Sequence, residues 1–137
     1  MAEFKFAKPG LNAVGQYQLS GIPYATSTLA VLAASVMEVE FPTVTRFVTV
    51  VNENTGSNSA LRVGFSSLGI TNSNNYFLLD NGESYTGEFR VARIYLRGDA
   101  ANTSASVIAG LTMIELENLT TNWSASDGTG LYNDGIG

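Results

Sequence analysis

Short stretches with a two-residue apolar period, separated by turns rich in glycine, asparagine and serine, run through most of this chain. Residues 89–96 alternate two sets of side chains, which is the pattern of a β-strand with two usable faces. Residues 43–51 are rich in β-branched side chains, and the turn-rich segment NENTGSNS follows them. This repeated pattern predicts an all-β fold.

Further strands are expected on either side of a turn signal. Residues 61–65 place Leu61, Val63 and Phe65 on one face, and the short apolar run NNYFLL ends at Asp80-Asn81-Gly82. Asp-Asn-Gly is a typical β-turn sequence.

Two segments need separate interpretation. Residues 26–40 begin with a helix-like apolar spacing and end with alternating apolar and acidic residues, so we expect a loop or short helical turn that leads into an edge strand. Residues 106–116 are largely apolar on both sides. We therefore expect them to form a central strand that is covered on each face.

Seven or eight short strands in 137 residues predict one domain, an antiparallel β-sandwich of jelly-roll-like type. One of the strands is a weakly alternating segment, AVGQYQLSG, close to the start. We assign the sandwich to residues 17–119, an extended N-terminal arm to residues 1–16, and a glycine-rich C-terminal arm to residues 120–137.

Charged residues make up only 14% of the chain, against about a quarter in typical proteins. Two interpretations stay open: a surface that neighbouring subunits cover, or a neutral polar surface like that of many extracellular domains. The net charge is −5 and the basic residues form no run, so nucleic acid is not expected as a direct partner. On one strand Arg93 and Arg97 share a face that Arg90 does not share.

The chain contains no histidine and no cysteine, which removes the common general base, the thiolate nucleophile and the commonest metal ligands. A Ser-Lys dyad would need Lys5 or Lys8, both in the N-terminal arm. We therefore expect no enzyme activity, no catalytic residue, no cofactor and no metal. The chain also has no apolar run of signal-peptide or membrane-spanning length, so neither secretion by that route nor a membrane span is expected.

Three weaker patterns have a structural and a functional interpretation. Glu38 and Glu40, like Glu115 and Glu117, are paired carboxylates that suit either glycosidase chemistry or the solvent face of a protected edge strand. The acidic turn at residues 80–83 suits either calcium or a hairpin. The scattered tyrosines suit core and rim packing better than a sugar-stacking platform.

Several segments resemble small virion structural proteins of marine viruses and tailed phages. They are GLNAVGQYQLSGIPYAT, VTRFVTVVNENTGSNSALRVGFSSLGI, NNYFLLDNGESYTGEFRVARIYLRG, VIAGLTMIE and the closing NWSASDGTGLYNDGIG. The resemblance runs from about Gly10 to the end of the sequence, and the closing segment is longer than the short ending typical of the group.

This resemblance implies a capsid-associated subunit, such as a decoration, minor capsid or vertex protein, located in the virion and made in the host cytoplasm. Its expected partners are copies of itself, as a trimer or pentamer, and the major capsid protein. The arms would lie on adjoining subunits, with Phe4, Phe6 and Trp123 as candidate interface anchors. Alternatively these three aromatics fold back onto their own domain. The alternative function is a receptor- or glycan-binding module of a viral fibre or tail.

Overall fold

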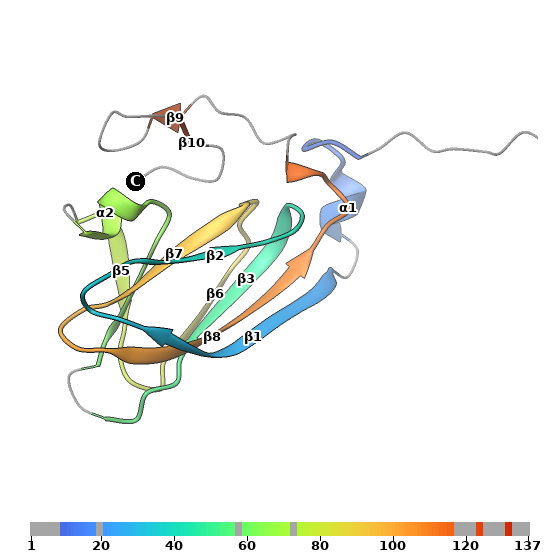
Figure 1. Ribbon diagram of the computed structural model, residues 1–137. Helices are drawn as coiled ribbons and strands as arrows, with labels where there is room; N and C mark the ends of the chain where they lie inside the picture. The colour runs from blue at the N-terminus through green and yellow to red at the C-terminus, as the bar shows by residue number, and fades with distance from the viewer. Residues whose placement is uncertain are drawn as a thin grey trace, which may run out of the picture.

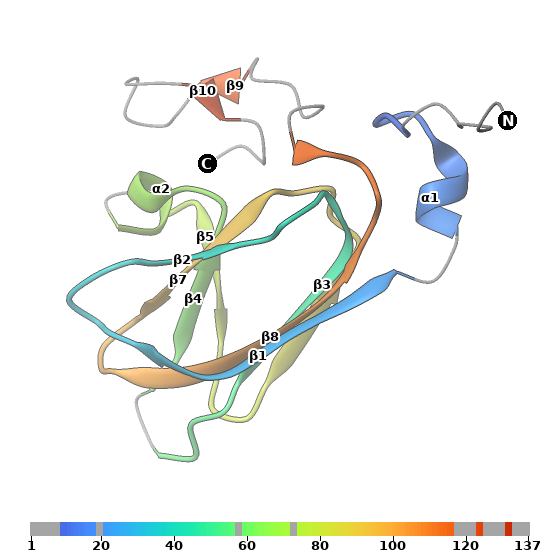
Figure 2. The same ribbon diagram turned by 45° about the vertical axis from the view of Figure 1, so that its right-hand side comes forward.

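The protein is a sandwich of two four-stranded antiparallel sheets (Figures 1 and 2). The computed structural model describes residues 9–18, 21–56, 59–71, 74–116, 123–124 and 131–132. The first sheet has the order β1-β8-β3-β6 and the second the order β2-β7-β4-β5. Their strands are β1 (Ile22–Val31), β8 (Thr103–Leu111), β3 (Thr45–Asn52), β6 (Ser84–Gly87), β2 (Met37–Glu40), β7 (Arg93–Gly98), β4 (Leu61–Gly64) and β5 (Tyr76–Leu79). The predicted all-β antiparallel sandwich is confirmed.

The strands pair from the two ends of the chain inward. The first strand pairs with the eighth, the second with the seventh, the third with the sixth and the fourth with the fifth. Two further ladders, β3 with β8 and β4 with β7, complete the sheets. The connectivity is therefore that of one long antiparallel hairpin wrapped around a common core.

The core lies between the two sheets because alternate residues of each strand point inward. On β8 the inward side chains are buried, with Ala105, Val107 and Ala109 at 0% exposure. On β3 they include Val48 and Val50 at 2% and 3% exposure. The main cluster contains Val31, Val39, Phe41, Val48, Val50, Leu61, Val63, Leu79, Val91, Ile94, Leu96, Ala105, Val107, Ala109 and Leu111. The two-residue periods seen in the sequence are thus the inward and outward positions of these strands.

Residues 26–31 correct the expectation of a loop or short helical turn. They belong to β1, which pairs with β8 from Ile22 to Val31. The ladder shifts between Thr26 and Leu29, where Thr28 has a φ of 53°. The helix-like spacing of Leu29, Leu32, Ala33 and Val36 crosses the end of β1 at Val31, so it combines the last residues of a strand with the loop that follows. The expected strand after it is confirmed as β2.

The weakly alternating segment near the start also differs from its expected form. It contains a short helix, α1 (Val14–Gln18), instead of a strand. Leu11, just before this helix, and Tyr17, within it, pack against a second buried cluster of Val44, Ala92 and Ile114. Residues 9–16 of the predicted N-terminal arm therefore contact the sandwich.

A turn at Asp80-Asn81-Gly82 passes from one sheet to the other. Gly82 has a φ of 78°, which glycine adopts without steric cost, and the Glu83 amide donates to the Asp80 carbonyl at 3.0 Å. The expected turn is present, but it does not close a hairpin, because β5 and β6 belong to different sheets. It forms a corner of the sandwich.

Three small elements complete the described residues. Helix α2 (Ser67–Thr71) lies beside β4 and β7 (Figure 1). Strands β9 (Trp123–Ser124) and β10 (Leu131–Tyr132) pair with each other. Among the described residues, no helix has the length and apolar character needed to cross a membrane.

Candidate interaction surfaces

The outer side of the β1-β8-β3-β6 sheet carries almost no charge. All residues of these four strands are described, and Arg46 is the one charged residue among them. Its Nε donates to the Tyr17 carbonyl, which draws the guanidinium towards α1. We call this outer side the neutral face. Its outward side chains include Ala25, Ala30, Thr49, Val51, Thr86, Ser104 and Ile108.

Ile108 lies near the middle of the neutral face. It is 44% exposed although β8 is flanked by β1 and β3, while its chain neighbours Val107 and Ala109 are fully buried. The expected central position of this strand is confirmed, but the expected covering of both its faces is wrong. In the sequence, the polar Ser104 and Ser106 on the side of Ile108 already indicate that this side is not part of the core. In the structure Ser106 is itself buried, and its hydroxyl donates to the Glu53 carboxylate.

The outer side of the β2-β7-β4-β5 sheet has the opposite character. Arg93 lies 2.6 Å from Glu38 and 3.9 Å from Glu40. The predicted shared face of Arg93 and Arg97 is confirmed, since they occupy alternate positions of β7, whereas Arg90 lies outside the strand. We call this side the charged face.

On the charged face, Glu38 and Glu40 lie on the edge strand β2 and face an arginine. This position matches the protected-edge interpretation of these glutamates. Glu117 of the second acidic pair lies outside the described residues.

Arg62 makes three further contacts on the side of the charged face. The Nε of Arg62 donates to the Asp99 carboxylate at 2.7 Å, and its Nη1 donates to the Ile70 carbonyl at 3.0 Å. Its guanidinium carbon lies 4.5 Å from the centre of the Tyr76 ring. These three contacts join β4, β5, α2 and the segment after β7.

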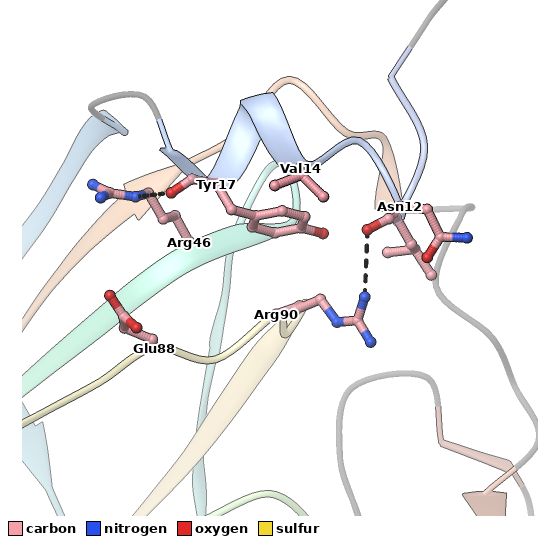
Figure 3. A pocket seen from close by; sticks show the side chains of 7 residues that line it. Asn12, Val14, Tyr17, Arg46, Glu88 and Arg90 are labelled. Atoms are coloured by element: carbon pink, nitrogen blue, oxygen red, sulfur yellow. Dashed lines mark hydrogen bonds between the residues drawn. The ribbon is translucent and has the colours of Figure 1, made fainter.

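An open pocket of about 420 Å³ lies beside α1 (Figure 3). The Tyr17 ring lies between Arg46 and Arg90, and Arg90 Nη1 donates to the Leu11 carbonyl at 3.3 Å. Among the described residues, the buried Tyr17 hydroxyl has no hydrogen-bond partner. The pocket combines two cations with one carboxylate, Glu88, and an apolar wall. Sequence reasoning did not identify it, because its residues come from three distant segments.

The acidic turn lines a smaller hollow of about 340 Å³ together with Ser59 and Asp99. Asp99 is already paired with Arg62. Within the described part of the chain, no group of three or more acidic side chains gathers as a metal site would require. The hollow therefore offers two separated carboxylates and no cation cage.

Several of the tyrosines expected to pack in the core and rim do so in the described part of the chain, among them Tyr24 and Tyr85. Tyr24 meets Phe41 edge-on with ring centres 5.2 Å apart. Tyr85 lies 5.0 Å from Phe77 and 6.3 Å from Phe89, at the rim of the core. These rings are engaged with their own domain.

The three candidate anchors lie largely beyond what the structure describes. Phe4 and Phe6 fall outside the described residues. The backbone of Trp123 pairs with Tyr132 in the β9-β10 ladder, and its side chain is not described. Their role as interface anchors stays a prediction.

No family model matches the chain, and no curated protein matches it. One solved structure is similar to 82% of this chain over its own full length, with 14% identity and a TM-score of 0.43. It is described by the words "Bacillus endospore appendages form a novel family of disulfide-linked pili". A likeness at this level defines no family.

Proposed function

We propose that this chain is a virion structural protein, a capsid-associated subunit of the decoration, minor capsid or vertex type. It would stabilise the shell by contacts with copies of itself and with the major capsid protein. The observation that carries the proposal is the division of the sandwich into a neutral face and a charged face. A face with little charge loses little solvation when a neighbouring subunit covers it.

The strand order supports the finer fold assignment. Eight strands that pair from the ends inward, in two sheets of four, are the arrangement of a jelly roll, which recurs in viral capsid proteins. The sequence resemblance to virion proteins supports the same assignment. Fold alone does not imply function, so the assembly state has to be measured.

The first experiment is light scattering of the purified protein over a hundredfold range of concentration. A mass of several subunits that persists on dilution supports a pre-assembled building block, with a trimer or pentamer as the ring expected from the resemblance. A monomer at every concentration would contradict self-association. Mass spectrometry of purified virions from the source then tests location, because a shell subunit must occur there in a constant ratio to the major capsid protein.

The α1 pocket favours a second candidate, the receptor- or glycan-binding module. Its volume lies within the usual range of ligand sites, and Tyr17, Arg46 and Arg90 offer an aromatic ring and two cations. A saturable change in protein fluorescence on titration with acidic sugars, lost in Arg90→Ala, would support it. A flat titration together with self-association leaves the shell role as the better account.

A further inference from the structure

We propose that the neutral face is a two-fold contact between two copies of this chain, centred on Ile108. This inference rests on the self-assembly in the proposed function, but it expects an even number of subunits in place of the trimer or pentamer that the resemblance implies, because a two-fold contact joins copies in pairs. It names the partner surface, which is the same face of a second copy.

The side chains beside Ile108 in its outward row are small. Ala25 on β1 and Thr49 on β3 are its direct cross-strand partners, and Thr86 on β6 continues the row beyond Thr49. The Thr49 and Thr86 hydroxyls hydrogen-bond to each other at 2.8 Å, so neither requires water as its sole partner. Sheets pack at about 10 Å when the side chains between them are of this size. A second sheet can therefore approach Ile108 closely.

The distribution of charge favours the neutral face of the second copy, rather than its charged face, as the partner surface. If the neutral face covered the charged face of another copy, it would desolvate Glu38, Glu40 and Arg97 without offering them an opposite charge, which is unfavourable. When two neutral faces meet, the acidic group close to the contact is Glu53, which directly follows β3 and already accepts a hydrogen bond from the Ser106 hydroxyl. The chain carries a net charge of −5, so two copies repel least where neither surface has charge.

The edges of the two sheets are less suitable for joining copies. The edge strand β1 contains Pro23, which has no amide hydrogen, and a register shift at Thr26/Leu29. The edge strand β2 is guarded by Glu38 and Glu40, while β5 and β6 have four residues each. These features discourage strand addition.

The available area fits a moderate contact. The strands β1, β8, β3 and β6 have 10, 9, 8 and 4 residues, and with about 3.3 Å per residue and about 4.8 Å between strands they span on the order of 500 Å². A standard interface covers about 800 Å² per partner. The neutral face thus provides most of the area of a stable pair, and residues at its margin can provide the rest.

The test is Ile108→Glu with Leu78→Glu as its matched control. Leu78 is 49% exposed on β5, at an outward position of the charged-face sheet, so the same substitution is made at nearly the same exposure. Ile108→Glu is expected to weaken self-association by at least about a hundredfold, because the two-fold axis brings two carboxylates together. Leu78→Glu is expected to keep the wild-type mass. Circular dichroism melts confirm that both variants are folded.

Placing opposite charges at position 108 of two copies tests two-fold pairing specifically. Ile108→Glu and Ile108→Lys should each be monomeric, and their equimolar mixture should form a mixed pair visible by native mass spectrometry. If Ile108→Glu fails to fold, Ala25→Glu and Ala25→Lys repeat the experiment on the exposed edge of the same row.

The outcomes separate this inference from the proposed function. An oligomer that persists in Ile108→Glu, or a wild-type mass of an odd number of subunits, overturns the two-fold contact and leaves self-assembly intact. A wild-type monomer at every concentration overturns both.

Discussion

The Thr103 hydroxyl donates a hydrogen bond of 2.8 Å to the Oδ1 of Asn52, in the fully buried end of the sandwich. The Nδ2 of Asn52 donates to the carbonyls of Ser59 and Leu79, at 2.8 and 3.0 Å. Its backbone amide donates to the Glu83 carbonyl, and its backbone carbonyl accepts from the Gly82 amide, both in the corner turn. One asparagine therefore joins β3 to β8 and to the opposite sheet.

Replacing this asparagine should destabilise the domain strongly. Asn52→Ala leaves two buried carbonyls and the Thr103 hydroxyl without this partner, at an expected cost of about 3 kcal/mol. Urea unfolding followed by fluorescence measures the change. Asn75→Ala, at an exposed position, is the control and should change stability by less than about 0.5 kcal/mol. Equal stabilities of the two variants would contradict the bridging role.

Replacing Gly98 by alanine should lower the stability of the domain. A Cβ there would lie 2.2 Å from the Ala101 carbonyl oxygen and 3.2 Å from the Ala33 nitrogen, both backbone atoms. Gly98→Ala is expected to cost about 2 kcal/mol by overpacking. Gly15→Ala is the control, because nothing lies within 4 Å of its added methyl group and alanine favours the helix α1. It should raise stability by roughly 0.5 kcal/mol. Thermal melts of both variants measure the contrast.

Arg62, on the charged face, should stabilise the fold through the geometry of its guanidinium as well as through its charge. Arg62→Lys keeps the charge but loses the planar group that bonds Asp99 and Ile70 and lies over Tyr76. We expect a loss of about 1 kcal/mol in urea unfolding, since the side chain is only 20% exposed. Arg90→Lys, which loses a single bond at 3.3 Å, should be close to neutral. A neutral Arg62→Lys would show that charge alone suffices.

A high salt concentration should not dissociate an assembly that forms through the neutral face. Screening weakens contacts between exposed charges but leaves apolar burial intact, and sulfate strengthens burial. Light scattering between 50 and 500 mM sodium chloride, concentrations chosen to span about a threefold change in Debye length, should show constant or tighter association. Dissociation at high salt would point instead to the charged face.

The N-terminal segment should contribute to assembly more than to the fold of one subunit. Deletion of residues 1–8 keeps Gly10, whose carbonyl accepts the Ala13 amide at 3.0 Å just before α1. We expect weaker assembly and an unchanged melting temperature of the sandwich. Phe4→Ala with Phe6→Ala should reproduce the deletion if these aromatics are anchors. A large fall in monomer stability would favour their folding back onto their own domain.

The sequence by itself determined the strand character of most of this chain. β3, β4 and β5 were predicted because apolar side chains alternate within a few residues, and the corner turn was predicted because Asp80-Asn81-Gly82 has its own local preference. The absence of histidine and cysteine likewise limits the available chemistry without any structure. These properties depend on neighbouring residues alone.

Tertiary structure decided the rest. Residues 26–31 are a strand because β8 supplies pairing partners 72 to 81 residues away. The acidic turn joins two sheets because β5 and β6 pair with different strands. Ile108 is exposed because no described element covers its side of β8. The α1 pocket exists because the fold brings together Tyr17, Arg46 and Arg90, which lie 29 to 73 residues apart in the chain. Pairing partners and burial are properties of contacts between distant residues, and local periodicity carries no information about which residues those will be.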